Sequence, residues 1–85
     1  MSFKLSIVAP SGKIFEDTVD SIAVIGTEGG FEVYSRHMPL ISSLKAGRAR
    51  VRQAGRETAY EITSGILEVG LDHNVTLLAD QATAV

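Results

Sequence analysis

The sequence predicts an all-β fold, a small flattened β-sandwich of about seven to nine or more short, mostly antiparallel strands. Three observations support this. Apolar residues recur at every second position in several segments, turn-forming residues separate these segments, and no segment repeats its apolar residues with the helical period of about 3.6. The chain has 85 residues, which is enough for a single domain over residues 1–85.

The first half of the chain contains four predicted strands. Residues 14–15 begin the second, residues 19–25 form the third with an end that is apolar on both faces, and residues 31–34 form a short fourth. Pro10 and Gly12 hold the second and fourth positions of the first turn, as a type I turn prefers. Residues 35–43 form an irregular connection, with room for one helical turn. One buried face of the first strand is predicted from its alternating apolar residues, Phe3, Leu5, Ile7 and Ala9.

A charged hairpin is predicted after this connection. Residues 44–53 alternate again, and three arginines share one face while Ala49 and Val51 take the other. With a two-residue loop at 54–55, Arg52 lies opposite Glu57 and Arg48 opposite Glu61. A three-residue loop would instead place Arg52 opposite Arg56, so the charges favour the first register. The arginine face consists of Arg48, Arg50 and Arg52.

The apolar period slips once in the last third of the chain, at Ser64 and Gly65. Such a slip indicates a bulge or a tight bend, after which Leu67, Val69 and Leu71 form the apolar set. A turn at residues 72–74 precedes the last strand, and residues 81–85 are expected to fray. The side chains expected to be mostly buried across the whole fold are Leu5, Ile7, Phe15, Ile22, Val24, Val51, Ile62, Leu67 and Leu77.

Composition excludes several classes of protein. A net charge of -2 and a pI near 5.5 give no overall basic field to attract nucleic acid or acidic lipid. The absence of cysteine excludes disulfides and thiolate metal sites, and it favours a reducing compartment. The longest apolar run, residues 22–25, is far shorter than the about 20 residues of a membrane helix, and the N-terminus does not have the pattern of a signal peptide.

No motif predicts catalysis, a cofactor, a nucleotide site or a metal site. The glycine-rich segment 26–30 lacks the lysine of a P-loop, and Glu28 would repel phosphate. His37 and His73 do not have metal-ligand spacing, and Ser64 lacks the first glycine of a nucleophile elbow. The sequence therefore favours a binding protein over an enzyme.

The arginine face has three interpretations. A solvated strand face paired with glutamates is favoured, because the predicted register supplies those partners. A patch for a protein partner is the second interpretation. The third is single-stranded nucleic-acid binding on an OB-like surface, which the lack of stacking aromatics between the arginines disfavours. An OB-like nucleic-acid module, or another small β interaction module, is thus the alternative function.

Two stretches match a known family in order and separation. The first is VIGTEG at residues 24–29 with HMPLI at residues 37–41, similar to the family's G-x-E-G and G-H-A-P-L-L. The second is SGILEV at residues 64–69 with NVTLLAD at residues 74–80, similar to G-G-I/F-L-E-V and N-V-T-V-L-A-D. Residues 5–82 therefore resemble the N-terminal β-sandwich domain of the epsilon subunit of F-type ATP synthases, which is called delta in mitochondria.

This resemblance implies a non-catalytic central-stalk subunit that binds the gamma subunit, contacts the c ring and couples proton flow to ATP synthesis. It also implies peripheral association with the cytoplasmic face of the cell inner membrane. The family's inhibitory C-terminal helical hairpin has no counterpart in residues 1–85, so no inhibition of ATP hydrolysis is expected. The residues implied to face gamma are His37, Pro39, Leu40 and Ser42, and those implied to face the c ring are Glu28, Gly29, Gly30 and Phe31.

Overall fold

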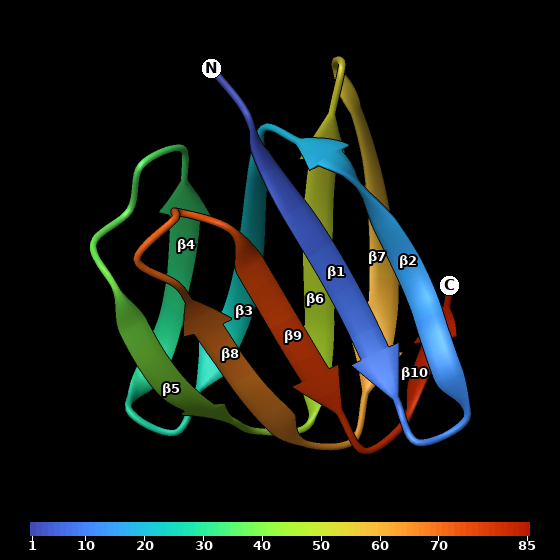
Figure 1. Cartoon of the computed structure of the whole chain (residues 1–85). Coiled ribbons are helices and arrows are strands. Elements are labelled where there is room, and N and C mark those ends of the chain that lie inside the picture. Colours follow the sequence, from blue (N-terminus) through green and yellow to red (C-terminus); the bar gives the residue numbers. More distant parts are fainter.

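The computed structural model describes residues 1–85 as ten β-strands without a helix, which confirms the all-β prediction (Figure 1). No helix of the chain therefore has the length and hydropathy that crossing a bilayer demands. The strands are β1 (Phe3–Ala9), β2 (Gly12–Val19), β3 (Ser21–Gly26), β4 (Gly29–Tyr34), β5 (Leu40–Leu44), β6 (Gly47–Gln53), β7 (Arg56–Ile62), β8 (Gly65–Val69), β9 (Val75–Ala79) and β10 (Ala82–Ala84).

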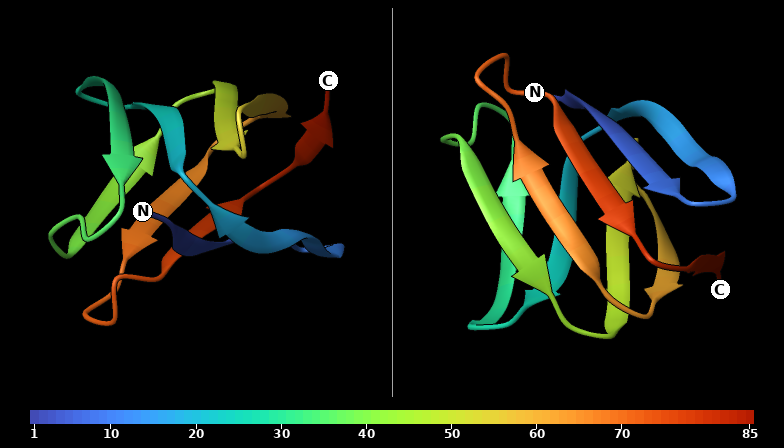
Figure 2. Two further views of the ribbon diagram at one scale, coloured as in Figure 1. Left: turned by 90° about the horizontal axis from the view of Figure 1, so that it is seen from above. Right: turned by 60° about the horizontal axis from the view of Figure 1, so that its bottom comes forward.

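The strands form two layers that face each other across one core (Figures 1 and 2). The back layer contains β4, β3, β6, β7 and β10, and the front layer contains β5, β8, β9, β1 and β2. The layers are continuous at one side, where Gly26 of β3 pairs with Leu44 of β5. All pairings are antiparallel except that of β1 with β9. The molecule is therefore a sandwich that is nearly closed into a barrel.

The core lies between the layers and consists of the inward-facing residues, which alternate with outward-facing ones along the strands. The side chains predicted to be buried are buried, apart from Phe15, which is partly buried against the cluster and packs at a ring-centroid distance of 6.0 Å from Tyr60. The placement of Leu71 in the apolar set was wrong, because this residue lies in the β8–β9 turn and is 88% exposed.

The charged hairpin has the predicted register. Arg52 pairs with Glu57 and Arg48 with Glu61 across β6 and β7, with nitrogen–oxygen distances of 3.3 and 3.7 Å. The two loop residues Ala54 and Gly55 both have positive φ, 51° and 79°, as a two-residue type I′ turn requires. The opposite charges and the turn chemistry therefore select the same register.

Two expectations about the middle of the chain were wrong. Residues 40–44, expected to belong to an irregular connection and to the start of the next strand, form β5, which pairs with β8. Val19 ends β2, so the strand expected over residues 19–25 begins at Ser21 instead. Both differences arise because pairing with a strand elsewhere in the sequence supplies hydrogen bonds that local propensity does not predict.

Residues 82–84 of the C-terminal tail, for which the sequence predicts no strand, are paired in the structure. Ala82 to Ala84 form β10 against β7, and the Val85 N–H donates to the Ala59 carbonyl at 3.0 Å. The slip at Ser64 and Gly65 is a bend between β7 and β8, as predicted. A β-carbon on Gly65 would overlap the Leu78 carbonyl oxygen of β9, so this close approach of two strands requires glycine.

The outer face of β1 and β2 carries a small charge cluster. The Glu16 carboxylate lies 2.6 Å from Lys13 Nζ and 3.1 Å from Lys4 Nζ, and accepts a 3.3 Å hydrogen bond from the Ser6 hydroxyl. Hydrogen bonds from Lys13 and Lys4 lower the pKa of Glu16 from 4.5 to about 2. The ionised carboxylate is therefore favoured in the folded chain.

This lowered pKa predicts a pH-dependent stability. Because the folded state holds the Glu16 proton less tightly than the unfolded state, ionised Glu16 stabilises the fold above pH 4.5, and this contribution is lost as the pH falls toward 2. Thermal midpoints of the unchanged chain and of Glu16→Gln should differ at pH 7 and converge near pH 2. A difference that stayed constant over this range would contradict the ion cluster.

Candidate protein interface

The outer face of the front layer carries a row of apolar side chains that are exposed or half-buried, hereafter the apolar row. Its members are Val8 of β1, Leu78 of β9 and Ile66 of β8, which are direct neighbours because Val8 pairs with Leu78 and Leu78 pairs with Ile66. Ile66 is 44% and Leu78 46% exposed. A hollow of about 560 Å³ lies over this row and is also lined by Pro10. Adjacent exposed apolar side chains of this kind are typical of a surface that binds another protein.

A polar row borders the apolar row on the same face. The row consists of Glu68 on β8, Thr76 on β9 and Ser6 on β1. These residues are neighbours because Thr76 pairs with Glu68 on one side and with Ser6 on the other. Glu16 extends this row onto β2. An apolar centre beside a polar margin is the usual anatomy of a protein interface.

The residues implied to face gamma lie beside this surface, on β5 and the loop before it. Two of them are at least partly accessible to solvent, and two point toward the inside of the sandwich. Pro39 is exposed, and His37 is half-buried with Nδ1 2.8 Å from the Met38 carbonyl oxygen. Leu40 packs against the core, and Ser42 points inward near Gly26. The outward residues of this strand are Ile41 and Ser43, and Ile41 is 73% exposed and pairs with Glu68.

The loop between β4 and β5 is tied to the β8–β9 turn. His73 Nδ1 lies 3.3 Å from the His37 carbonyl oxygen, although the two histidines are far apart in the sequence. The turn itself is ordered by a hydrogen bond of 3.0 Å from the Asn74 N–H to the Asp72 carboxylate. The two loops therefore form one continuous margin of the front layer.

The residues implied to face the c ring lie in the β3–β4 turn and at the start of β4, at the lower end of the molecule (Figure 1). Glu28, Gly29 and Gly30 are exposed there. Phe31 is half-buried, because its ring packs inward on Gly26, where a β-carbon would lie 2.9 Å from the ring. The exposed part of the predicted contact is therefore residues 28–30, hereafter the tip.

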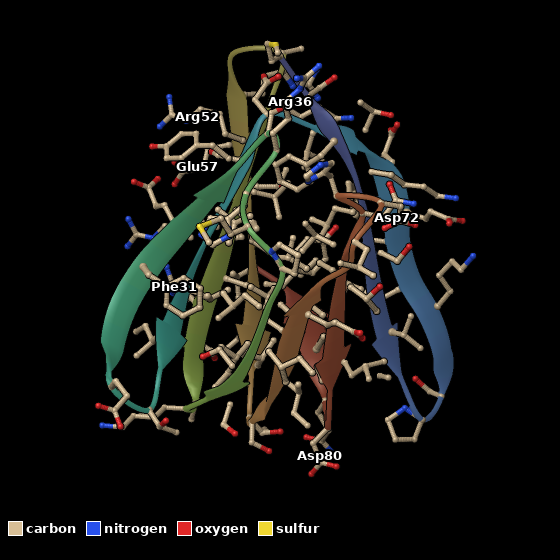
Figure 3. All side chains as sticks on the ribbon, turned by 60° about the vertical axis from the view of Figure 1, so that its left-hand side comes forward. Phe31, Arg36, Arg52, Glu57, Asp72 and Asp80 are labelled. Carbon is tan, nitrogen blue, oxygen red and sulfur yellow. The ribbon has the colours of Figure 1, made fainter.

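The arginine face lies on the outer side of the back layer, whereas the apolar row lies on the front layer; Figure 3 labels Arg52 of this face and its partner Glu57. Arg52 and Glu57 lie together at its upper end, and Arg50 makes no ion pair because its neighbour across β6 and β7 is Ala59. On β4, the Tyr34 hydroxyl donates to Glu32 at 3.0 Å, and this carboxylate raises the pKa of Tyr34. The face thus interleaves both signs of charge.

The apolar row is not among the predicted site residues, although the sequence contains a signal for it. Each member is an apolar residue directly beside a buried one: Val8 follows Ile7, Ile66 precedes Leu67, and Leu78 follows Leu77. In a strand with one solvated face the second residue of such a pair is expected to be polar. Three pairs on three neighbouring strands therefore mark an apolar outer face.

No group of three histidine, aspartate or glutamate side chains lies close enough to hold a metal ion.

The chain matches the family model described as ATP synthase, Delta/Epsilon chain, beta-sandwich domain, over residues 2–85. It is 40% identical over 79 residues to an ATP synthase epsilon chain of Pelotomaculum thermopropionicum, covering 93% of this chain and 58% of the relative. It is 37% identical over 84 residues to one of Anaeromyxobacter sp. (strain K), covering 99% and 63%. The chain thus spans less than two thirds of the length of these relatives.

Two solved structures have the same fold. A chain in the mitochondrial ATP synthase of Euglena gracilis, a structure of OSCP/F1/c-ring, has a TM-score of 0.92 at 21% identity, covering 98% of this chain and 53% of that chain. A chain in the Tetrahymena thermophila mitochondrial ATP synthase, a structure of central stalk/c-ring, has a TM-score of 0.84 at 12% identity, covering 96% and 66%. With the family match over residues 2–85, this chain belongs to the ATP synthase delta/epsilon family and corresponds to its β-sandwich domain.

Proposed function

We propose that the chain is a non-catalytic central-stalk subunit of an F-type ATP synthase. It binds the gamma subunit, contacts the c ring and so couples proton flow to ATP synthesis. The observation that carries this proposal is membership of the delta/epsilon family over residues 2–85 together with an exposed apolar row on one outer face. The chain works within a membrane-bound complex, and we place it peripherally at the cytoplasmic face of the cell inner membrane.

The apolar row is the surface that we assign to gamma. Ile66 and Leu78 are exposed and Val8 is half-buried in the isolated chain, and covering them with a partner removes apolar area from water. His37, Pro39 and Ile41 extend this contact along β5 and the loop before it. Leu40 and Ser42 point inward, so they support this part of the surface from behind.

The tip is the surface that we assign to the c ring, as a second contact beyond the gamma surface. Glu28, Gly29 and Gly30 are exposed at one end of the sandwich, and Phe31 anchors the turn by packing on Gly26. A contact at the end of the sandwich leaves the apolar row free for gamma. Close packing between the layers makes the body between the two contacts stiff, which the transmission of torque requires.

Reconstitution tests this function. An F-type complex depleted of its epsilon chain should regain ATP-driven proton pumping when this chain is added, and the chain should co-purify with gamma in a one-to-one ratio. Glu28→Cys carrying a short photo-cross-linker should give a product with the c subunit. A chain that elutes apart from gamma and leaves pumping unrestored would contradict the proposal.

A further inference from the structure

A second surface lies on the back layer, on the side of the molecule away from the apolar row. Strand β3 lies between β4 and β6 there, and Ala23 pairs with Glu32 on one side and with Arg50 on the other. A groove of about 440 Å³ follows β3 between these neighbours. Its lining includes Ala23, Ile25, Gly30, Glu32, Arg48 and Arg50.

A helix that lies along this groove would meet both of its walls. An α-helix with its side chains is about 10 Å across, and the strands on either side of β3 lie about 4.8 Å from it, so a helix over β3 would have its flanks over β4 and β6. The floor is low because Ala23 and Gly30 have small or absent side chains. Ile25 is 42% exposed and gives the floor an apolar residue at its lower end.

The two walls of the groove have opposite charge. Glu32 stands on the β4 wall, and Arg48 and Arg50 stand on the β6 wall. Arg48 has a partner in Glu61 at 3.7 Å, whereas Arg50 has Ala59 as its cross-strand neighbour and no carboxylate partner. The β6 wall therefore has an unpaired guanidinium for an incoming acidic side chain.

We propose that this groove binds an amphipathic helix of a partner protein other than gamma. The helix places small apolar side chains over Ala23 and Ile25, acidic side chains against Arg48 and Arg50, and basic side chains against Glu32. Nucleic acid fits the face less well, because Glu32, Glu57 and Glu61 lie among its arginines and cancel the positive field that phosphates require.

A designed helical peptide of about 18 residues serves as the probe. It has alanine and leucine on one face, glutamates on one flank and lysines on the other. The control peptide has lysines on both flanks. A peptide with the two flanks exchanged would be no control, because it could make the same charge pairs by lying in the groove in the opposite direction. Titration into the ¹⁵N-labelled chain should shift the amide signals of residues 23–25, 30–32 and 48–50. The affinity of the control peptide should be at least about five-fold lower than that of the probe.

Variants of the chain locate the binding. Arg50→Glu should lower the affinity for the probe about five-fold, and Ala23→Gln should lower it similarly, because the larger side chain fills the floor of the groove. Arg56→Glu, at an exposed position outside the groove, should change this affinity little. Both groove variants should keep their affinity for gamma, so the outcome is independent of the function proposed above. The proposal would be overturned if no amide signals shifted, or if the shifts occurred at Val8, Ile66 and Leu78 instead. It would also be overturned by tight, salt-dependent binding of single-stranded DNA that Arg50→Glu abolishes.

Discussion

Replacing Ile66 and Leu78 together with glutamate should weaken gamma binding by about a hundred-fold or more and leave the sandwich folded. Both side chains point outward, so the new carboxylates remain hydrated in the isolated chain. In the complex they would lose water without gaining a partner, which costs several kcal/mol. Isothermal titration calorimetry with the cognate gamma subunit measures the affinity, and a thermal melt verifies folding.

Ile25→Glu is the matched control for this prediction. Ile25 is 42% exposed, close to the 46% of Leu78, but it lies on the outer face of the back layer. The same chemical change on the opposite face should therefore leave the affinity for gamma unchanged. Equal losses in the two proteins would show a general loss of structure, and unchanged affinity in the double variant would place the gamma interface elsewhere.

Leu77→Ala should lower the free energy of unfolding by about 3 kcal/mol. Leu77 is fully buried between the layers, so truncation removes apolar contacts and leaves a cavity that close-packed neighbours fill only in part. For a domain of this size, that loss corresponds to a decrease in thermal midpoint of roughly 15 °C. Urea denaturation followed by circular dichroism measures the change.

The adjacent Leu78→Ala is the control for the core prediction. The two leucines have the same chemistry and neighbouring positions on β9, but Leu78 points to solvent. Its truncation should cost less than about 1 kcal/mol. Similar costs at both positions would mean that β9 does not present one buried and one exposed face.

The sequence predicts the hairpin of β6 and β7 well because all of its determinants are local. The charges of Arg48, Arg52, Glu57 and Glu61 and the loop at 54–55 act within a short stretch of chain, and they agree on one register. The same holds for the alternating core residues of β1. Period-2 patterns settle which residues share a face, so most of the core was predictable.

Pairing between distant segments was not predictable in this way. β5 pairs with β8 and β10 pairs with β7, and neither residues 40–44 nor residues 82–84 have an alternation strong enough to indicate a strand alone. The candidate interface has the same origin. Val8, Ile66 and Leu78 come from three segments, and only the order β8, β9, β1 in the sheet brings them together. Their individual signal was visible, but their adjacency required the topology.

Site-directed cross-linking tests the assignment of the apolar row to gamma most directly. The chain has no cysteine, so each introduced cysteine is a unique attachment point for a photo-cross-linker. In a reconstituted F-type complex, Val8→Cys and Leu78→Cys should form products with gamma in high yield, whereas Thr83→Cys on the exposed edge of the back layer should form none. Products with gamma from Thr83→Cys, and none from Leu78→Cys, would contradict the account.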